Sequence, residues 1–172
     1  SYKKINYNSN KNKEIRDTYL DKENLNYRVG GKLMLLSPQK NDLFWLSSRI
    51  SLGRNDSTKQ GYLFSELIST LKFNKWLTFN VSPKYFFSGV DNIGALGISS
   101  NLNFFKSLSV LTEANIGLSD DSESNNTFAL RYSYSPNKSL DLYGTNAVGL
   151  ADIGQMLKSD DYKFGIKLNF IF

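Results

Sequence analysis

Residues 162–172, YKFGIKLNFIF, alternate between two kinds of side chain. Every second residue is aromatic or aliphatic: Tyr162, Phe164, Ile166, Leu168, Phe170 and Phe172. Because successive side chains of a β-strand point to opposite faces, this period of two predicts a strand with one apolar face. The mean hydropathy of the whole chain is nevertheless negative, at −0.38. The fold therefore depends on what this apolar face contacts.

The same period of two recurs along the chain, and no long stretch prefers the helical period of 3.6. The predicted strands run about ten to twelve residues, longer than the five or six typical of globular proteins. They match the nine to eleven that a tilted strand needs to cross a bilayer. The pattern predicts nine strands, near 26–37, 43–54, 62–73, 76–87, 93–105, 108–119, 127–136, 140–150 and 162–172.

A weaker tenth strand is predicted at residues 2–8, where Ile5 and Tyr7 share a face. The connections alternate between short and long. The short ones are 38–42, 74–75, 106–107 and 137–139, and the longer ones are 9–25, 55–61, 89–92, 120–126 and 151–161. Tight turns at one end and larger loops at the other are typical of an antiparallel up-and-down transmembrane β-barrel. We therefore expect one domain over 1–172, comprising the weak first strand at 1–8, a long charged external loop at 9–25 and the other strands at 26–172.

The composition excludes several classes of function. The chain has no His and no Cys, which removes His-based catalysis, nearly all zinc sites and disulfides. The net charge is +5, but no basic cluster with interleaved aromatics forms a motif that reads nucleic acid. We expect no enzyme, no catalytic residue, no cofactor and no nucleic-acid partner.

Two structures share this alternation. In a soluble barrel the apolar face is the core, and in a membrane barrel it meets lipid while the polar face lines the lumen. The polar face here is rich in small and amide side chains, such as Ser51, Asn80 and Ser99, which suit a crowded lumen. Aromatic residues gather near the predicted strand ends, as they do at membrane–water boundaries. They are Tyr27, Tyr62, Trp76, Phe104, Phe105, Tyr134, Tyr162 and Phe172.

The last strand resembles the C-terminal strand of bacterial outer-membrane β-barrels. Those strands commonly end on Phe after alternate apolar residues, as in Phe164, Ile166, Leu168, Phe170 and Phe172. The resemblance implies a bacterial or organellar outer membrane, a lipid bilayer as partner, and the barrel assembly machinery as the reader of this strand. We therefore expect the apolar face of this strand to meet lipid, and the strand to close the barrel against residues 2–8.

The functions expected from this reading are a narrow passive channel that prefers anions, or a structural or surface-contact barrel whose long loops bind a surface ligand. Two alternatives stay open. One is a soluble β-barrel that binds a hydrophobic ligand, and the other is the terminal barrel domain of a longer exporter or surface protein.

The charged positions of the polar face are the candidate lumen-lining residues. They comprise eight bases and three acids: Arg28, Lys32, Arg49, Glu66, Lys72, Lys84, Glu113, Arg131, Asp141, Lys163 and Lys167. This surplus of bases predicts a positive field inside the barrel, which attracts anions.

Two long loops carry further candidates. Hard oxygen ligands for Ca²⁺ are weakly suggested by Asp120, Asp121, Glu123, Asp160 and Asp161, although no established calcium-loop spacing is present, and we predict no metal site. The apolar residues of 151–161, namely Ile153, Met156 and Leu157, suggest a short helix over the barrel mouth, a fold-in constriction or a partner contact. Within 9–25, Ile15 and Tyr19 are spaced for one or two helical turns.

Overall fold

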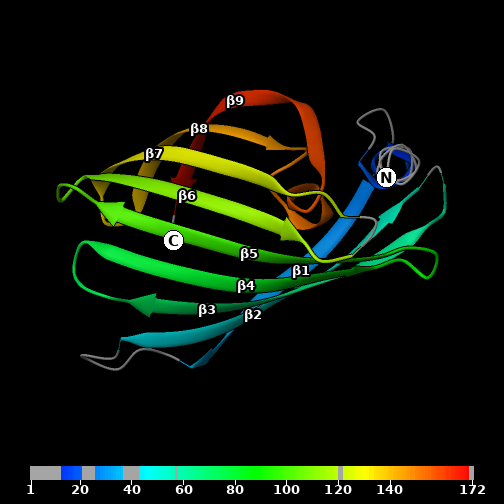
Figure 1. The fold of residues 1–172 in the computed structure, drawn as a ribbon, viewed down its shortest axis with the longest axis horizontal. Coiled ribbons are helices and arrows are strands. Elements are labelled where there is room, and N and C mark those ends of the chain that lie inside the picture. Colours follow the sequence, from blue (N-terminus) through cyan, green and yellow to red (C-terminus); the bar gives the residue numbers. More distant parts are fainter. Residues whose placement is uncertain (1–12, 21–25, 37–42, 57, 120–121, 171–172) are drawn as a thin grey trace.

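The computed structural model describes residues 13–20, 26–36, 43–56, 58–119 and 122–170. Within them the chain forms a nine-stranded antiparallel sheet in which each strand pairs with the next along the sequence (Figure 1). The strands are β1 (Asn26–Leu36), β2 (Phe44–Asn55), β3 (Gly61–Lys72), β4 (Leu77–Phe87), β5 (Asn92–Asn103), β6 (Leu108–Gly117), β7 (Asn125–Ser135), β8 (Lys138–Ala147) and β9 (Lys158–Phe170).

The nine predicted strands are confirmed with small shifts at their ends. The largest shift is at β9, which begins at Lys158 rather than at residue 162. Its first residues join the sheet across a register irregularity between Thr145 and Ala147 of β8. Asp160 and Asp161 therefore lie in a strand and not in the loop where the sequence placed them.

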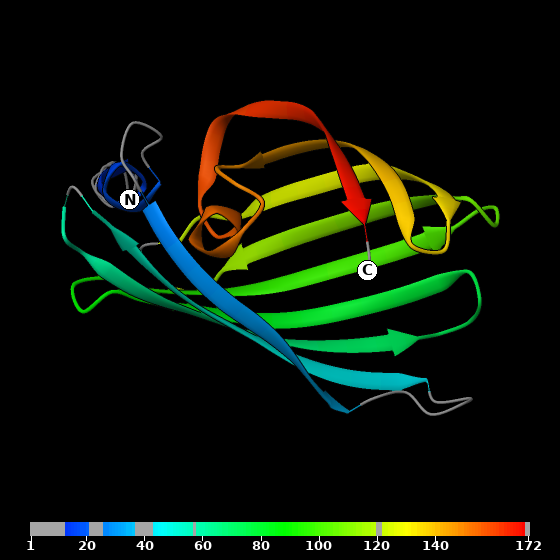
Figure 2. The same ribbon diagram turned by 180° about the vertical axis from the view of Figure 1, so that it is seen from behind.

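The sheet is not closed across the described residues, because β1 and β9 do not pair with each other. The predicted strand at 2–8 lies outside the described residues. What the structure establishes is a strongly curved up-and-down sheet, with the chain between β8 and β9 on its concave side (Figure 2).

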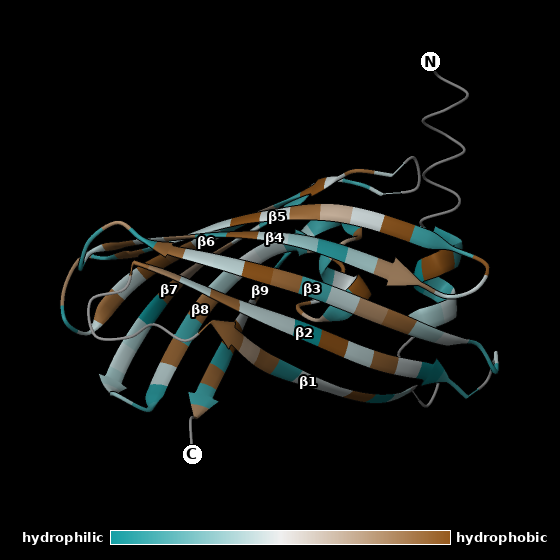
Figure 3. Ribbon diagram, turned by 90° about the horizontal axis from the view of Figure 1, so that it is seen from below, coloured by the Kyte–Doolittle hydropathy of each residue, from teal (hydrophilic) through white to brown (hydrophobic). Residues whose placement is uncertain are grey.

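The two faces of the sheet differ in the way that the alternation predicts. The inner face, which we define as the face that holds Lys84 and Asp141, carries most of the buried polar side chains. The outer face carries exposed apolar side chains, including Val29 at 71 % exposure and Phe164 at 74 %. Brown and teal segments accordingly alternate along the strands in Figure 3.

The sheet has two distinct ends. At the turn end, the tight connection between β3 and β4 is closed by Phe73 N–H, which donates to Leu77 O at 3.1 Å. At the loop end lie the connections β2–β3, β4–β5, β6–β7 and β8–β9, together with residues 13–19, which are helical. The helical spacing expected for Ile15 and Tyr19 is thus confirmed.

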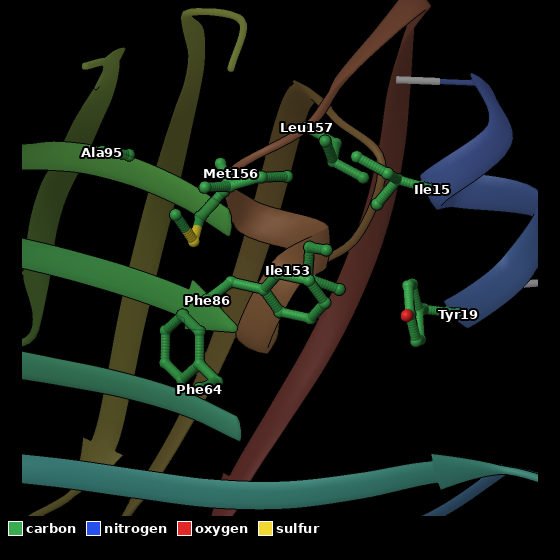
Figure 4. Close-up of a cluster of buried hydrophobic side chains, with 9 residues drawn as sticks. Ile15, Tyr19, Phe64, Phe86, Ala95, Ile153, Met156 and Leu157 are labelled. Atoms are coloured by element: carbon green, nitrogen blue, oxygen red, sulfur yellow. The ribbon is translucent and has the colours of Figure 1, made fainter. Parts of the chain in front are cut away.

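A compact apolar core fills the inner side of the loop end (Figure 4). The strands contribute Phe64, Phe86, Ile93 and Ala95, the helix contributes Ile15 and Tyr19, and the β8–β9 connection contributes Ile153, Met156 and Leu157. Ile15 is 1 % exposed and Tyr19 is 3 % exposed. The described part of 9–25 is therefore packed against the sheet rather than projecting as an external loop, because Ile15 and Tyr19 are buried in this core and Leu20 packs against it.

The β8–β9 connection folds inward as one unit. Residues 148–157, which we call the plug segment, contain the short 3-10 helix η1 (Asp152–Gln155). Val148 N–H donates to Leu157 O at 3.0 Å, and Gly149 N–H donates to Gly154 O at 2.9 Å. The short helix expected for this connection is present as η1, and the connection also folds into the inner side of the sheet. None of the described helices is long and apolar enough to cross a membrane.

Candidate functional site

The strand register places all eleven candidate lumen-lining residues on the inner face. Arg49 lies opposite both Lys32 and Glu66, and Glu66 in turn lies opposite Lys84. Asp141 lies between Arg131 and Lys167. The alternation of residues 62–73 is compatible with either phase, and the structure places Lys72 and Glu66 on the same face of β3 as the buried Phe64.

Lys84 is the centre of the charged network. Its side chain is 0 % exposed, and its ammonium donates to Glu113 Oε1 at 2.5 Å, Gln155 Oε1 at 2.6 Å and Asn115 Oδ1 at 2.7 Å. Glu66 Oε1 lies 3.6 Å away. A buried ammonium needs this number of partners, because burial without them costs several kcal/mol.

The plug segment is held by its own carboxylate. Asp152 is 2 % exposed and accepts hydrogen bonds from Arg49 Nη2 at 2.6 Å, Arg28 Nη1 at 3.3 Å and Tyr62 Oη at 3.4 Å. Its φ of +50° is a left-handed conformation that a non-glycine residue adopts only where its surroundings hold it. The arginine pair supplies that restraint.

The sequence analysis did not single out Asp152. The available signal was one acid in the mostly apolar stretch 151–157, within a loop already suspected of folding inward. Only the tertiary contacts reveal its partners, which come from β1, β2 and β3, about a hundred residues away in the sequence.

Three bases and three acids form a network of ion pairs on the inner face near the loop end, and their charges sum to zero. Arg28, Arg49 and Lys84 face Glu66, Glu113 and Asp152, which we call the loop-end cluster. Arg131 and Asp141 form a separate bidentate ion pair, in which Arg131 Nε donates to Asp141 Oδ1 at 2.7 Å and Arg131 Nη2 donates to Asp141 Oδ2 at 2.8 Å. Within the described residues four inner lysines remain without an acidic hydrogen-bond partner: Lys32, Lys72, Lys163 and Lys167. Lys163 donates to the carbonyl of Val148 at 3.1 Å.

A cavity of about 240 Å³ lies on the inner face beside the loop-end cluster. Its walls come from β4 to β9 and from Leu150 of the plug segment. Glu113, Asp141 and Lys167 are the ionisable side chains that line it. The interior thus has an apolar seal at the loop end and a polar hollow next to it.

The outer face is nearly free of charge. Among the register-paired outward positions of the described strands, the charged side chains are Arg54 and Lys138, and both lie at strand ends. Several outward hydroxyls lie in the interior of the face, including those of Ser48, Ser65 and Ser69. The hydroxyls of Ser100 and Thr112 bond each other at 2.8 Å. A surface of this kind is typical of contact with hydrocarbon, where unpaired polar groups are costly.

Exposed aromatic side chains border this apolar surface at both ends. Phe73, Trp76, Phe104 and Phe105 lie at the turn end, and Tyr27, Tyr85, Phe87 and Tyr162 lie toward the loop end. Tyr62, which the sequence grouped with the boundary aromatics, instead points inward to Asp152. Its position on β3 shares the face of Phe64, which explains the difference.

The remaining candidates fall as follows. Phe164, Ile166, Leu168 and Phe170 share the outer face of β9 and are between 49 % and 74 % exposed, whereas Phe172 lies outside the described residues. Asp120 and Asp121 also lie outside them. In the part of the chain that the structure describes, no group of three or more acidic side chains is placed to hold a metal ion.

Comparison of the chain with protein-family models, with curated proteins and with solved structures gives no match in any of the three.

Proposed function

We propose that the protein is an integral outer-membrane β-barrel of ten strands, sealed near its loop end, that serves as a structural or surface-contact barrel. The observation that carries this proposal is the distribution of charge. Eleven charged positions share the inner face, while the outer face exposes apolar side chains and, at the register-paired positions of the described strands, carries charge only at strand ends. This is the inverse of a soluble sheet protein and suits a surface that meets lipid.

Residues 2–8 complete the proposed barrel. The strands β1 and β9 both run from the loop end to the turn end, so an antiparallel strand between them runs the other way. A segment that starts at the turn end would deliver the chain to the helix at 13–19, which lies at the loop end. Ile5 and Tyr7 would then continue the outer apolar face. Closure is required in a bilayer, because unpaired strand edges do not persist in hydrocarbon.

The apolar seal favours the structural role over the open channel. Ile153 and Met156 are each 0 % exposed, and both come from a plug segment tied to the wall through Asp152. A continuous water path through the loop end would have to displace this packing. The proposed role of the terminal strand, β9, is to present its outward Phe164, Ile166, Leu168 and Phe170 to the assembly machinery.

A narrow anion-preferring channel is the second candidate, and the four lysines without acidic partners favour it. They leave the inner face positive even though the loop-end cluster is neutral. The soluble barrel with an apolar interior does not suit the exposed apolar face of β1, β4 and β9.

Membrane fractionation combined with gel mobility tests the proposal. The full-length protein should sediment with outer membranes, require detergent for extraction and migrate differently before and after boiling. Recovery in the soluble fraction as a folded monomer without detergent would overturn it. Planar-bilayer recording then separates the two roles, since the sealed barrel gives no conductance steps and the channel gives small anion-selective ones.

A further inference from the structure

The 240 Å³ cavity on the inner face has a set of hydrogen-bonding groups that the protein itself leaves unused. Its size is below the roughly 300–1,000 Å³ of pockets for drug-sized ligands, so it suits a small solute. The walls are polar enough to hold such a solute in one orientation. The question is which chemistry they select.

On one wall, two successive side-chain hydrogen bonds end at Ser99. Thr70 Oγ1 donates to Asn80 Oδ1 at 2.7 Å, and Asn80 Nδ2 donates to Ser99 Oγ at 2.9 Å. A hydroxyl that accepts one hydrogen bond still has its own proton to donate. The Ser99 proton has no acceptor among the described residues, and Ser99 lines the cavity.

The opposite wall supplies a cation and a second hydroxyl. Of the four lysines without an acidic hydrogen-bond partner, Lys167 lines the cavity, and it lies opposite Asp141 in the sheet. Tyr143 lies on the neighbouring strand β8. Neither the Lys167 ammonium nor the Tyr143 hydroxyl makes a hydrogen bond within the described residues. The other charges nearby are matched, since Glu113 accepts from Lys84 and Asp141 accepts from Arg131. These pairs leave the exposed ammonium of Lys167 as one further positive charge on the cavity wall. A hydrogen bond from an ammonium to an anion is stronger than one between neutral groups.

One acceptor is also unused. Asn101 Oδ1 is buried and has no hydrogen-bond partner among the residues that the structure describes, and Asn101 lines the same cavity. Leaving a buried acceptor unpaired costs about 1–3 kcal/mol, which a ligand donor would recover.

From this set of groups we propose that the cavity binds a small organic monocarboxylate that also carries a hydrogen-bond donor, such as a short hydroxy acid. The carboxylate accepts from Lys167, Ser99 and Tyr143, and the ligand hydroxyl donates to Asn101 Oδ1. This inference rests on the proposed barrel, because closure of the sheet is what encloses the cavity.

The test is saturation-transfer NMR with lactate as the probe, on full-length protein folded in detergent micelles. Acetate, which has the carboxylate but lacks the hydroxyl donor, is the control ligand. Lys167→Met and Tyr143→Phe are the site variants, and Tyr143→Phe keeps the ring that packs over Gly165. Lys72→Met removes another lysine without an acidic partner and is the control, since Lys72 does not line the cavity.

We expect saturable lactate binding that weakens about tenfold or more in Lys167→Met, several-fold in Tyr143→Phe and not at all in Lys72→Met. Acetate should bind several-fold more weakly than lactate. Equal lactate binding by Lys167→Met and the unmodified protein, or no saturation by lactate, would overturn the inference. Gel mobility on the same samples reports folding, so a folded barrel that ignores lactate refutes this site alone, whereas failure to fold in detergent refutes the proposed barrel.

Discussion

Lys84 crosses the inner face directly over Gly97. A Cβ added to Gly97 would lie 2.9 Å from Lys84 Cε and 2.5 Å from Ser82 Oγ. The missing side chain on β5 lets the lysine on β4 reach Glu113 and Asn115 on β6. The centre of the charged network thus depends on an uncharged residue.

Gly97→Ala should destabilise the protein because the new methyl group displaces Lys84 or Ser82 in a packed interior. Overpacking of this kind typically costs about 1–3 kcal/mol in the free energy of unfolding. Urea unfolding of the protein in lipid vesicles measures the change. Gly31→Ala is the control, since a Cβ there meets nothing within 4 Å. Equal effects of the two substitutions would mean that the space above Gly97 is not needed.

Lys84→Met should cost more, about 3–5 kcal/mol, because it leaves the carboxylates of Glu66 and Glu113 near each other without their shared cation. Adding Glu113→Gln should restore part of that loss by removing one uncompensated charge. The measurement is again unfolding in vesicles, with Lys72→Met as the matched control. A double variant no more stable than Lys84→Met would argue against a charge-based network.

The two faces of the sheet predict opposite tolerance to arginine. Leu130 points outward on β7 and is 42 % exposed, so Leu130→Arg should cost about 2–4 kcal/mol in a bilayer. Ser133→Arg, three positions along the strand and on the inner face, should cost less. Refolding titrations into vesicles compare them directly. Similar penalties at both positions would contradict contact between the outer face and lipid.

Weakening the seal should open the loop end. Ile153 and Leu157 are 0 % and 1 % exposed, and replacing both with Ser removes about 1.5–3 kcal/mol of apolar burial for each side chain. Planar-bilayer recording should then show larger, anion-selective steps than the unmodified protein. Leu150→Ser, on the same segment but 44 % exposed, should leave conductance unchanged. If the double variant conducts no better, the plug segment is not the barrier.

The sign of the selectivity follows from the lysines without acidic partners. Lys72→Glu combined with Lys163→Glu, in the variant with the weakened seal, should shift its preference toward cations. Lys84 is unsuited to this test, because its charge belongs to the buried loop-end cluster. Reversal potentials in a salt gradient give the measurement, and an unchanged anion preference would place the selective charges elsewhere.

Packing of the helix at 13–19 against the sheet should weaken at high pH. Burial raises the pKa of Tyr19 above its ordinary value, and Asp91 adds to the rise against a hydrogen bond with Ser88 that lowers it. The neutral hydroxyl is therefore the form that the folded state favours. Its contribution to stability is present below the ordinary tyrosine pKa of about 10 and is lost as pH rises through the folded value. Proteolysis within residues 13–20 should accelerate above that pH, and Tyr19→Phe should remove this dependence.

The sequence by itself determined the strands and their two faces. A period of two is visible in every strand, so the inward placement of Arg49, Lys84 and Arg131 was predictable. The phase of the strand that holds Glu66 was ambiguous in the sequence, and its pairing with the neighbouring strands decided it. Even the two helical turns around Ile15 and Tyr19 left a signal in their spacing.

The tertiary structure alone decided how the inner charges are paired and how the interior is sealed. Asp152 finds Arg28 and Arg49 only because the β8–β9 connection folds back against strands formed near the start of the chain. No local pattern encodes such a contact, since it depends on curvature of the whole sheet. Asp152 thereby adds a fourth acid to the three predicted on the inner face. The eight bases divide into those of the neutral loop-end cluster, the Arg131–Asp141 pair and four lysines without an acidic hydrogen-bond partner.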